Sequence, residues 1–241
     1  MFVDINISGN FTRIYAENVV LICHGLPAEP GSVVEKNYDK LAKYFSKYVT
    51  PVIFDFSGCG LSRKEFRLKN WVEDVINIAS SFSTVDIVAF SMGGVAAVYA
   101  AANLRHVRSL TLVATPCCFE VLSENILNKI YSNAKSKGTL RGLRDFGGFV
   151  MDLKEDMMEF EPLKWIEDVR NVMFVHGTKD DIIPFESSER MFRFARSPKK
   201  LLRVVGGGHK LRQEKVVVDE IIRWITTEKK KDSIEDLNLR A

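Results

Sequence analysis

The sequence predicts an α/β fold, in which helices cover both faces of a mostly parallel central sheet. Three observations predict it: short apolar runs, helical segments between them, and a length and composition typical of a globular protein. The runs are rich in β-branched residues and nearly continuous, as expected for strands buried on both faces. They cover residues 19–23, 52–54, 85–90, 109–114, 172–175 and 201–205.

The segments between these runs carry apolar residues at helical spacing. Tyr38, Leu41 and Phe45, for example, recur at i, i+3 and i+7, which places them on one face of a helix. Because strands and helices alternate, the chain is expected to form βαβ units in an open sheet. The predicted helices cover residues 38–45, 71–79, 95–102 and 216–225.

The start of the chain has a different pattern. Val3, Ile5 and Ile7 alternate with polar residues, and a Ser8-Gly9-Asn10 turn separates them from a second apolar run at 11–15. This pattern predicts an antiparallel hairpin on the edge of the sheet.

A long insertion interrupts the alternation. Residues 117–165 carry amphipathic helical pieces at 121–131 and 140–151, and the segment is too long for a connecting loop. We therefore expect a core made of residues 1–116 and 166–241, and a helical cap made of residues 117–165. The Lys/Glu/Asp-rich residues 227–241 are expected to form a frayed tail.

Composition restricts the class of protein. The chain has 241 residues, 46% apolar and 27% charged, with 34 Lys+Arg against 31 Asp+Glu and a net charge of +3. This small, mixed charge argues against a nucleic-acid partner. No signal peptide is recognisable, and no apolar run approaches the roughly 18 residues of a membrane span. We expect a cytoplasmic protein without integral membrane association, and none of its four cysteines forms the C-x-x-C pair typical of zinc sites.

Residues that follow the predicted strands carry the candidate chemistry, because open α/β sheets bind ligands beyond the carboxyl ends of their strands. Ser91 follows the strand at 85–90, and the small residues Ala89 and Gly93 around it permit a tight strand-to-helix turn. Such a turn exposes the serine hydroxyl above the sheet and directs the backbone N–H of Met92 toward a developing oxyanion.

Three further strand ends complete a possible catalytic constellation. The backbone N–H of Leu26, after the strand at 19–23, is a candidate second oxyanion donor. Asp180 and Asp181 follow the strand at 172–175, and His209 follows the last apolar run on a glycine-rich loop. Nucleophilic catalysis by serine needs a base and a carboxylate that orients the base, so Ser91, His209 and an aspartate of this turn are the candidate catalytic residues.

The sequence resembles the α/β-hydrolase family from about residue 19 to residue 225, and within it the small capped serine esterases and monoacylglycerol-lipase-like enzymes. Ala89 stands where the family usually has glycine, which leaves the turn feasible. The matching motifs are His24-Gly25, Asp55 to Ser62 (D-x-x-G-x-G-x-S), Ala89 to Gly93, Gly177 to Pro184 and Gly208-His209.

The resemblance implies an α/β-hydrolase fold with a small helical cap after its sixth strand, and it assigns roles to residues. Ser91 would be the nucleophile, Asp180 the acid and His209 the base; family spacing favours Asp180 over Asp181. In the family, the position of His24 shapes the oxyanion loop and that of His176 packs against the strands.

The implied activity is hydrolysis of a carboxylic ester with a small to medium apolar acyl group, through an acyl-enzyme intermediate. A small-molecule ester is the expected partner, and neither a cofactor nor a metal is required. Two alternatives stay open: an acyltransferase or thioesterase that uses the same triad, and a non-catalytic binding protein. The apolar residues of the cap suggest an acyl pocket, although packing of the cap against the core explains most of them equally well. A carboxylate such as Glu155 or Glu159 could instead bind a substrate amine.

Overall fold

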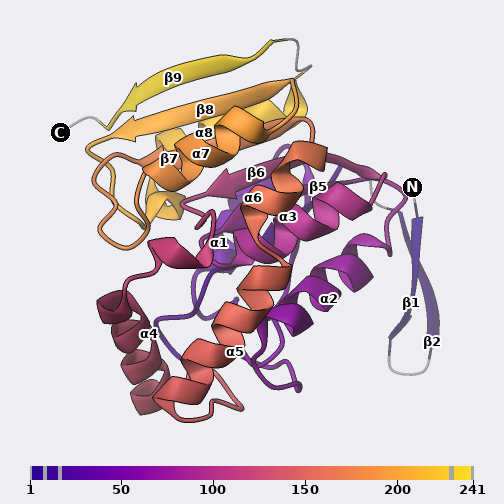
Figure 1. Ribbon diagram of the computed structural model, residues 1–241. Coiled ribbons are helices and arrows are strands. Elements are labelled where there is room, and N and C mark those ends of the chain that lie inside the picture. Colours follow the sequence, from indigo (N-terminus) through magenta and orange to yellow (C-terminus); the bar gives the residue numbers. More distant parts are fainter. Residues whose placement is uncertain (1, 8–9, 16–17, 228–230, 240–241) are drawn as a thin grey trace.

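The main feature of the fold is a seven-stranded sheet in the order β4-β3-β5-β6-β7-β8-β9, in which every neighbouring pair is parallel (Figure 1). The computed structural model describes residues 2–7, 10–15, 18–227 and 231–239. The six predicted apolar runs from residue 19 onward form strands of this sheet. The strands are β3 (Val19–Cys23), β4 (Thr50–Ile53), β5 (Val85–Phe90), β6 (Val107–Val113), β7 (Val172–Gly177), β8 (Lys199–Val205) and β9 (Ser233–Asn238).

Helices cover both faces of the sheet, because alternate residues of each strand point to opposite sides. Leu21 and Cys23 of β3 pack in the core beneath α2, α3 and α7, whereas Val20 and Ile22 pack in a second core beneath α1 and α8. The helices are α1 (Tyr38–Phe45), α2 (Leu68–Ala79), α3 (Gly93–Asn103), α4 (Glu124–Lys137), α5 (Phe146–Glu159), α6 (Pro162–Trp165), α7 (Glu186–Phe194) and α8 (Lys215–Thr226).

The four predicted helices correspond to α1, α2, α3 and α8, but the sequence analysis missed α7. This helix follows Pro184 and carries Glu186 and Glu189 in its first turn, which are signals of a helix start. None of the helices in the described part of the chain is long and apolar enough to cross a membrane.

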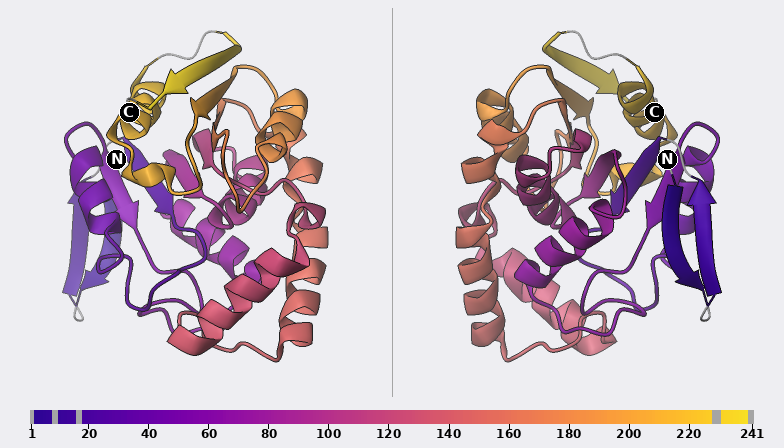
Figure 2. Two further views of the ribbon diagram at one scale, coloured as in Figure 1. Left: turned by 90° about the vertical axis from the view of Figure 1, so that its left-hand side faces the viewer. Right: turned by 90° about the vertical axis from the view of Figure 1, so that its right-hand side faces the viewer.

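The N-terminal hairpin forms as predicted but in another place. β1 (Phe2–Ile7) and β2 (Asn10–Tyr15) pair antiparallel as a separate two-stranded sheet rather than on the edge of the main sheet; residues 8 and 9 lie outside the described part. Figure 2 shows the hairpin standing apart from the main sheet. The edge strand β4 explains the difference. Thr50 N–H donates to the backbone O of Asn18, just before β3, so the next residue, Pro51, faces the open edge and offers no N–H for pairing.

The expectation of a frayed tail is wrong for residues 233–238, which form the edge strand β9. Acidic residues of β9 pair with basic residues of the neighbouring β8: Lys200 Nζ lies 2.7 Å from Glu235 and Arg203 Nε lies 2.6 Å from Asp236. The charged residues that suggested a frayed tail therefore belong to a strand, and they form ion pairs with the neighbouring strand. Residues 228–230 and 240–241 lie outside the described part of the chain.

The insertion between β6 and β7 is helical, with α4 and α5 at the opposite end of the molecule from β9 (Figures 1 and 2). Both helices begin later than predicted because polar side chains cap them. The Ser123 hydroxyl accepts from Ile126 N–H at 3.3 Å, and the Asp145 carboxylate accepts from Gly148 N–H at 2.7 Å. All four cysteines are buried and free, as expected for small core side chains.

Candidate active site

Ser91 lies in a sharp turn between β5 and α3. Its φ of 50° falls in the left-handed region that side-chain-bearing residues rarely adopt. Backbone hydrogen bonds hold this conformation, since Ser91 N–H donates to Val113 O at 2.8 Å and Gly94 N–H donates to Ser91 O at 2.9 Å. A non-glycine residue kept in this region needs support from its surroundings, and such residues cluster at functional sites.

Close backbone approach explains the small residues around Ser91. A Cβ atom on Gly93 would lie 2.2 Å from His24 O, and one on Gly25 would lie 2.9 Å from Ser91 Cβ. Both glycines are therefore needed for the loop after β3 to reach the serine. Ala89 is completely buried in β5, paired with Cys23 of β3, so its methyl group fits where the family usually has glycine.

His209 lies between Ser91 and Asp180. Its Nε2 atom is 3.0 Å from Ser91 Oγ, and its Nδ1 atom is 2.8 Å from Asp180 Oδ2. The three residues come from the ends of β5, β7 and β8, and only 17% of the His209 side chain is exposed. The structure thus brings together the three residues that the sequence singled out, in the order hydroxyl, imidazole, carboxylate.

Asp180 is the carboxylate of this group, whereas Asp181 is exposed. The Asp180 side chain has no exposed surface, and its Oδ1 atom accepts from Ile182 N–H and Ile183 N–H, each at 2.9 Å. Burial by itself would raise the pKa of Asp180. Hydrogen bonds from His176 and His209, together with the one from Ile183, outweigh burial and hold that pKa well below its usual range. Asp180 is therefore an anion at neutral pH.

Two backbone N–H groups lie on the loops that meet at Ser91. Within the described part of the chain, neither Leu26 N–H nor Met92 N–H donates to another group. Met92 immediately precedes α3, so its N–H belongs to a helix N-terminus, where partial positive charge accumulates. These are the donors that the sequence analysis predicted for an oxyanion.

His24 fixes the loop that carries Leu26. The ring is buried, with Nε2 accepting from Phe56 N–H at 3.0 Å and Nδ1 lying 2.7 Å from Gly25 O. This pattern requires a neutral ring with its proton on Nδ1. Burial lowers the pKa of His24 to about 4. Asp55 supports the same region, because its carboxylate accepts from Val33 N–H at 2.9 Å and from Leu61 N–H at 3.0 Å.

We expect His24 to make stability depend on pH between 6.5 and 4. Below pH 6.5 the unfolded chain binds a proton at this histidine, whereas the folded chain does so only near pH 4. The unfolded state therefore binds more protons in this window, and the free energy of unfolding should fall by about 3 kcal/mol as the pH is lowered through it. Denaturant unfolding at pH 7, 5.5 and 4 measures the change. His24→Gln, which keeps an acceptor for Phe56 N–H, should remove this part of the slope; an unchanged slope would contradict the assignment.

His176 is closer to the site than the sequence analysis expected, since it had been assigned to strand packing. Its Nε2 atom lies 3.0 Å from Ile183 O and 3.3 Å from Asp180 Oδ2, and Nδ1 lies 2.7 Å from the Ser188 hydroxyl. Asp180 thus faces two histidines. The spacing of His176 and Asp180, four residues apart across the end of β7, is the sequence signal that could have indicated this contact.

The remaining histidine, His106, lies elsewhere. His106 contacts Ala79 O at 3.1 Å, at the end of α2, and not the residues around Ser91. In the described ranges, no group of three or more His, Cys, Asp and Glu side chains is placed to hold a metal ion.

The insertion contacts the loops that surround the site. Lys137 of α4 pairs with Glu29 at 2.5 Å, beyond Leu26. Arg67, at the start of α2, lies 2.6 Å from Asp156 and 3.1 Å from Glu155 of α5.

The apolar residues of the insertion differ in how far they are buried. Phe149 and Met157 are buried, whereas Met151 and Met158 are 68% and 57% exposed and do not form part of an internal pocket. Glu155, a candidate for binding a substrate amine, is already paired with Arg67.

Three solved structures similar to this one are described as a lipase or as hydrolases. A monoacylglycerol lipase from Paleococcus ferrophilus is 17% identical, with 86% of this chain and 93% of that chain covered and a TM-score of 0.65. A hydrolase from Oleispira antarctica is 17% identical, with 89% and 93% covered and a TM-score of 0.66. A meta-cleavage product hydrolase from Pseudomonas fluorescens is 16% identical, with 92% and 96% covered and a TM-score of 0.64. At these identities, the similarity shows the fold.

Sequence comparison identifies the family. No curated protein matches the chain. The profile of the alpha/beta hydrolase family, however, matches residues 19–220, which is most of the chain and includes Ser91, Asp180 and His209. This match supports hydrolase activity. Because the profile covers more than half of the sequence, the chain belongs to the alpha/beta hydrolase family.

Proposed function

We propose that the protein is a serine hydrolase that cleaves carboxylic esters of small to medium apolar acids. One observation carries the proposal: His209 lies 3.0 Å from the Ser91 hydroxyl on one side and 2.8 Å from the Asp180 carboxylate on the other. This arrangement can remove the hydroxyl proton as the serine attacks a carbonyl carbon.

In the proposed first half-reaction, Ser91 Oγ attacks the ester carbonyl while His209 Nε2 accepts the hydroxyl proton. Asp180 keeps the His209 proton on Nδ1 and stabilises the imidazolium that forms. The carbonyl oxygen becomes an oxyanion, which the N–H groups of Leu26 and Met92 stabilise. When the tetrahedral intermediate collapses, the C–O bond to the alcohol breaks and His209 returns its proton to the leaving alcohol.

The second half-reaction repeats these steps with water. His209 takes a proton from a water molecule as the oxygen of that water attacks the acyl-enzyme. The N–H groups of Leu26 and Met92 stabilise the second oxyanion. Collapse releases the acid and returns the proton to Ser91. No step uses a metal or an organic cofactor.

We propose that residues 117–165 act as a cap that selects the acyl group. The insertion contacts the loop beyond Leu26 through Lys137 and Glu29, and it contacts α2 through Arg67 and Asp156. The first of these contacts joins the insertion to the loop that carries Leu26, the candidate oxyanion donor, and this supports the proposed role. The similarity to a monoacylglycerol lipase supports an apolar acyl group.

A panel of p-nitrophenyl esters from acetate to palmitate tests the proposal. Turnover with an optimum at a short or medium chain length is expected, and the optimum measures the apolar space available to the acyl group. Adding methanol or a thiol separates hydrolysis from acyl transfer, because a transferase would divert most of the acyl group from the acid to the added acceptor. The absence of turnover on every ester would contradict the proposed substrate class.

His176 should contribute to activity through Asp180. His176→Phe preserves an aromatic ring of similar size but removes the N–H group 3.3 Å from Asp180 Oδ2. Loss of this donor to a buried carboxylate should loosen the alignment of His209, and we expect kcat/KM to fall about tenfold with little change in KM.

His176→Gln is the matched variant, since its amide N–H₂ replaces the Nε2 donor. It should recover part of kcat. Equal losses of kcat/KM in the two variants would indicate that His176 has only a packing role. So would a fall in thermal stability with unchanged kcat/KM.

A further inference from the structure

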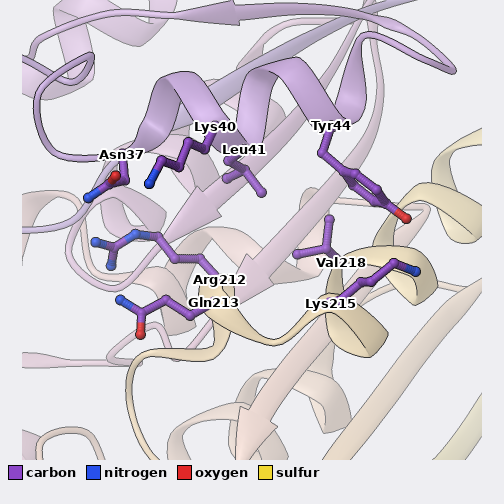
Figure 3. A pocket seen from close by; sticks show the side chains of 8 residues that line it. All are labelled: Asn37, Lys40, Leu41, Tyr44, Arg212, Gln213, Lys215 and Val218. Carbon is purple, nitrogen blue, oxygen red and sulfur yellow. The ribbon is translucent and has the colours of Figure 1, made fainter.

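A cleft of about 450 Å³ lies between α1 and the segment formed by η3 (Leu211–Gln213) and the start of α8 (Figure 3). None of the side chains that line it belongs to the group around Ser91. The cleft has two ends of different chemistry. In Figure 3 the polar ends of Asn37, Lys40, Arg212 and Gln213 gather at one end, and Leu41 and Val218 lie further along the cleft.

The charge of the cleft is positive. Its lining includes Lys40, Arg212 and Lys215 but no carboxylate. Lys215 is already committed, because its ammonium lies 2.8 Å from Asp219, which also accepts from the Tyr44 hydroxyl at 2.5 Å.

The other two cations are available. Within the described part of the chain, neither Lys40 nor Arg212 forms an ion pair or a side-chain hydrogen bond. An anion that bound here would therefore not have to displace an existing carboxylate.

Arg212 is oriented without using its N–H groups. Its guanidinium lies over the ring of Tyr38 at 4.9 Å from the centroid, and Tyr38 is itself buried. A cation–π contact of this kind uses the charge of the guanidinium and none of its N–H groups, so these donors stay available for a ligand. Asn37 has a φ of 66° at the start of α1, and in the described structure its side-chain amide, like that of Gln213, donates to no other group.

We infer that this cleft binds a small organic anion, namely a phosphomonoester or carboxylate attached to a compact apolar body. Lys40 and Arg212 would hold the anionic group, with the amides of Asn37 and Gln213 as further donors. The apolar body would lie against Leu41 and Val218. The volume is in the range of small-molecule sites. The inference is independent of the proposed esterase activity, since it concerns other residues and is tested by binding.

Titration of the ¹⁵N-labelled 241-residue protein with phenyl phosphate, at constant ionic strength, tests the inference. Saturable chemical-shift changes are expected at α1 and η3. Arg212→Gln and Lys40→Gln should each weaken binding about fivefold, as expected for a solvent-accessible charge contact, and the double variant should bind at least tenfold more weakly. Benzyl alcohol, which has a similar apolar body and no charge, should bind far more weakly than phenyl phosphate.

Two further variants serve as controls. One removes a lysine outside the cleft, and the other blocks the cleft without removing a charge. Lys129→Gln removes an exposed lysine of α4 and should leave binding unchanged. Gln213→Trp keeps both cations but fills the cleft, and it should abolish binding. Thermal melting verifies that each variant is folded.

Binding of the protein to phosphatidylglycerol vesicles is the second measurement. Vesicle binding that the double variant loses would identify the anion as a lipid head group, whereas binding of phenyl phosphate alone would identify a free anion. The inference is wrong if neither probe binds saturably, or if the double variant and Gln213→Trp bind phenyl phosphate as the wild type does.

Discussion

Ser91→Ala should reduce kcat for any p-nitrophenyl ester that the wild type hydrolyses by about 10⁵-fold or more. The hydroxyl oxygen that faces His209 Nε2 at 3.0 Å is then missing, so no acyl-enzyme can form. A small residual rate above that of water is expected, since the N–H groups of Leu26 and Met92 remain in place. Steady-state kinetics of the two proteins at matched concentration measure the ratio.

Stability provides the control for this variant. Ser91 has a φ of 50°, and alanine meets the same steric restriction there, so the melting temperature should change little. A folded Ser91→Ala protein that keeps more than a few per cent of wild-type activity would exclude Ser91 as the nucleophile. A second serine variant on the surface, Ser136→Ala of α4, should keep full activity.

Asp180→Asn should reduce kcat by about 10⁴-fold, because it reverses the hydrogen bond to His209. The Asp180 Oδ1 atom accepts from two backbone N–H groups, so the amide oxygen of asparagine must occupy that position. The amide N–H₂ then faces His209 Nδ1, which becomes an acceptor. The ring proton moves to Nε2, and His209 can no longer accept the proton of Ser91.

Asp181→Asn is the matched control, since it makes the same chemical change one residue further on, at an exposed side chain. It should alter kcat by less than about twofold, as expected of a surface substitution. The opposite ranking of the two variants would mean that the acid is wrongly assigned. Equal and small effects would mean that no carboxylate of this turn orients His209.

Local sequence patterns predicted the central strands of the sheet because these strands are buried on both faces. The run at 85–90 is buried throughout and apolar except for Asp86, and this pattern does not depend on what lies next to it. The hairpin and β9 depend on pairing partners instead. Nothing local to residues 2–15 specifies where the hairpin packs, and the acidic residues of β9 are recognisable as a strand only beside Lys200 and Arg203 of β8.

In the candidate site, too, some features follow from local sequence and others depend on how distant segments pack. The positions of Ser91, Asp180 and His209 were predictable because each lies within five residues of the end of a predicted strand, and parallel strands bring such ends to one edge of the sheet. The contacts of these three residues with their neighbours were not predictable from the sequence. The contact of His176 with Asp180 depends on how the turn after β7 folds back, and the cleft beside Arg212 depends on how α1 packs against η3.

Labelling with a fluorophosphonate, followed by mass spectrometry of the peptides, tests the central claim most directly. The reagent forms a covalent bond only with a serine that is deprotonated as it attacks, and it requires no knowledge of the substrate. We predict a single modification, on Ser91, that His209→Ala slows by several orders of magnitude while the protein stays folded. Failure to label Ser91 in the folded wild-type protein, or equal labelling in His209→Ala, would contradict the assignment of a serine hydrolase and favour a non-catalytic binding protein.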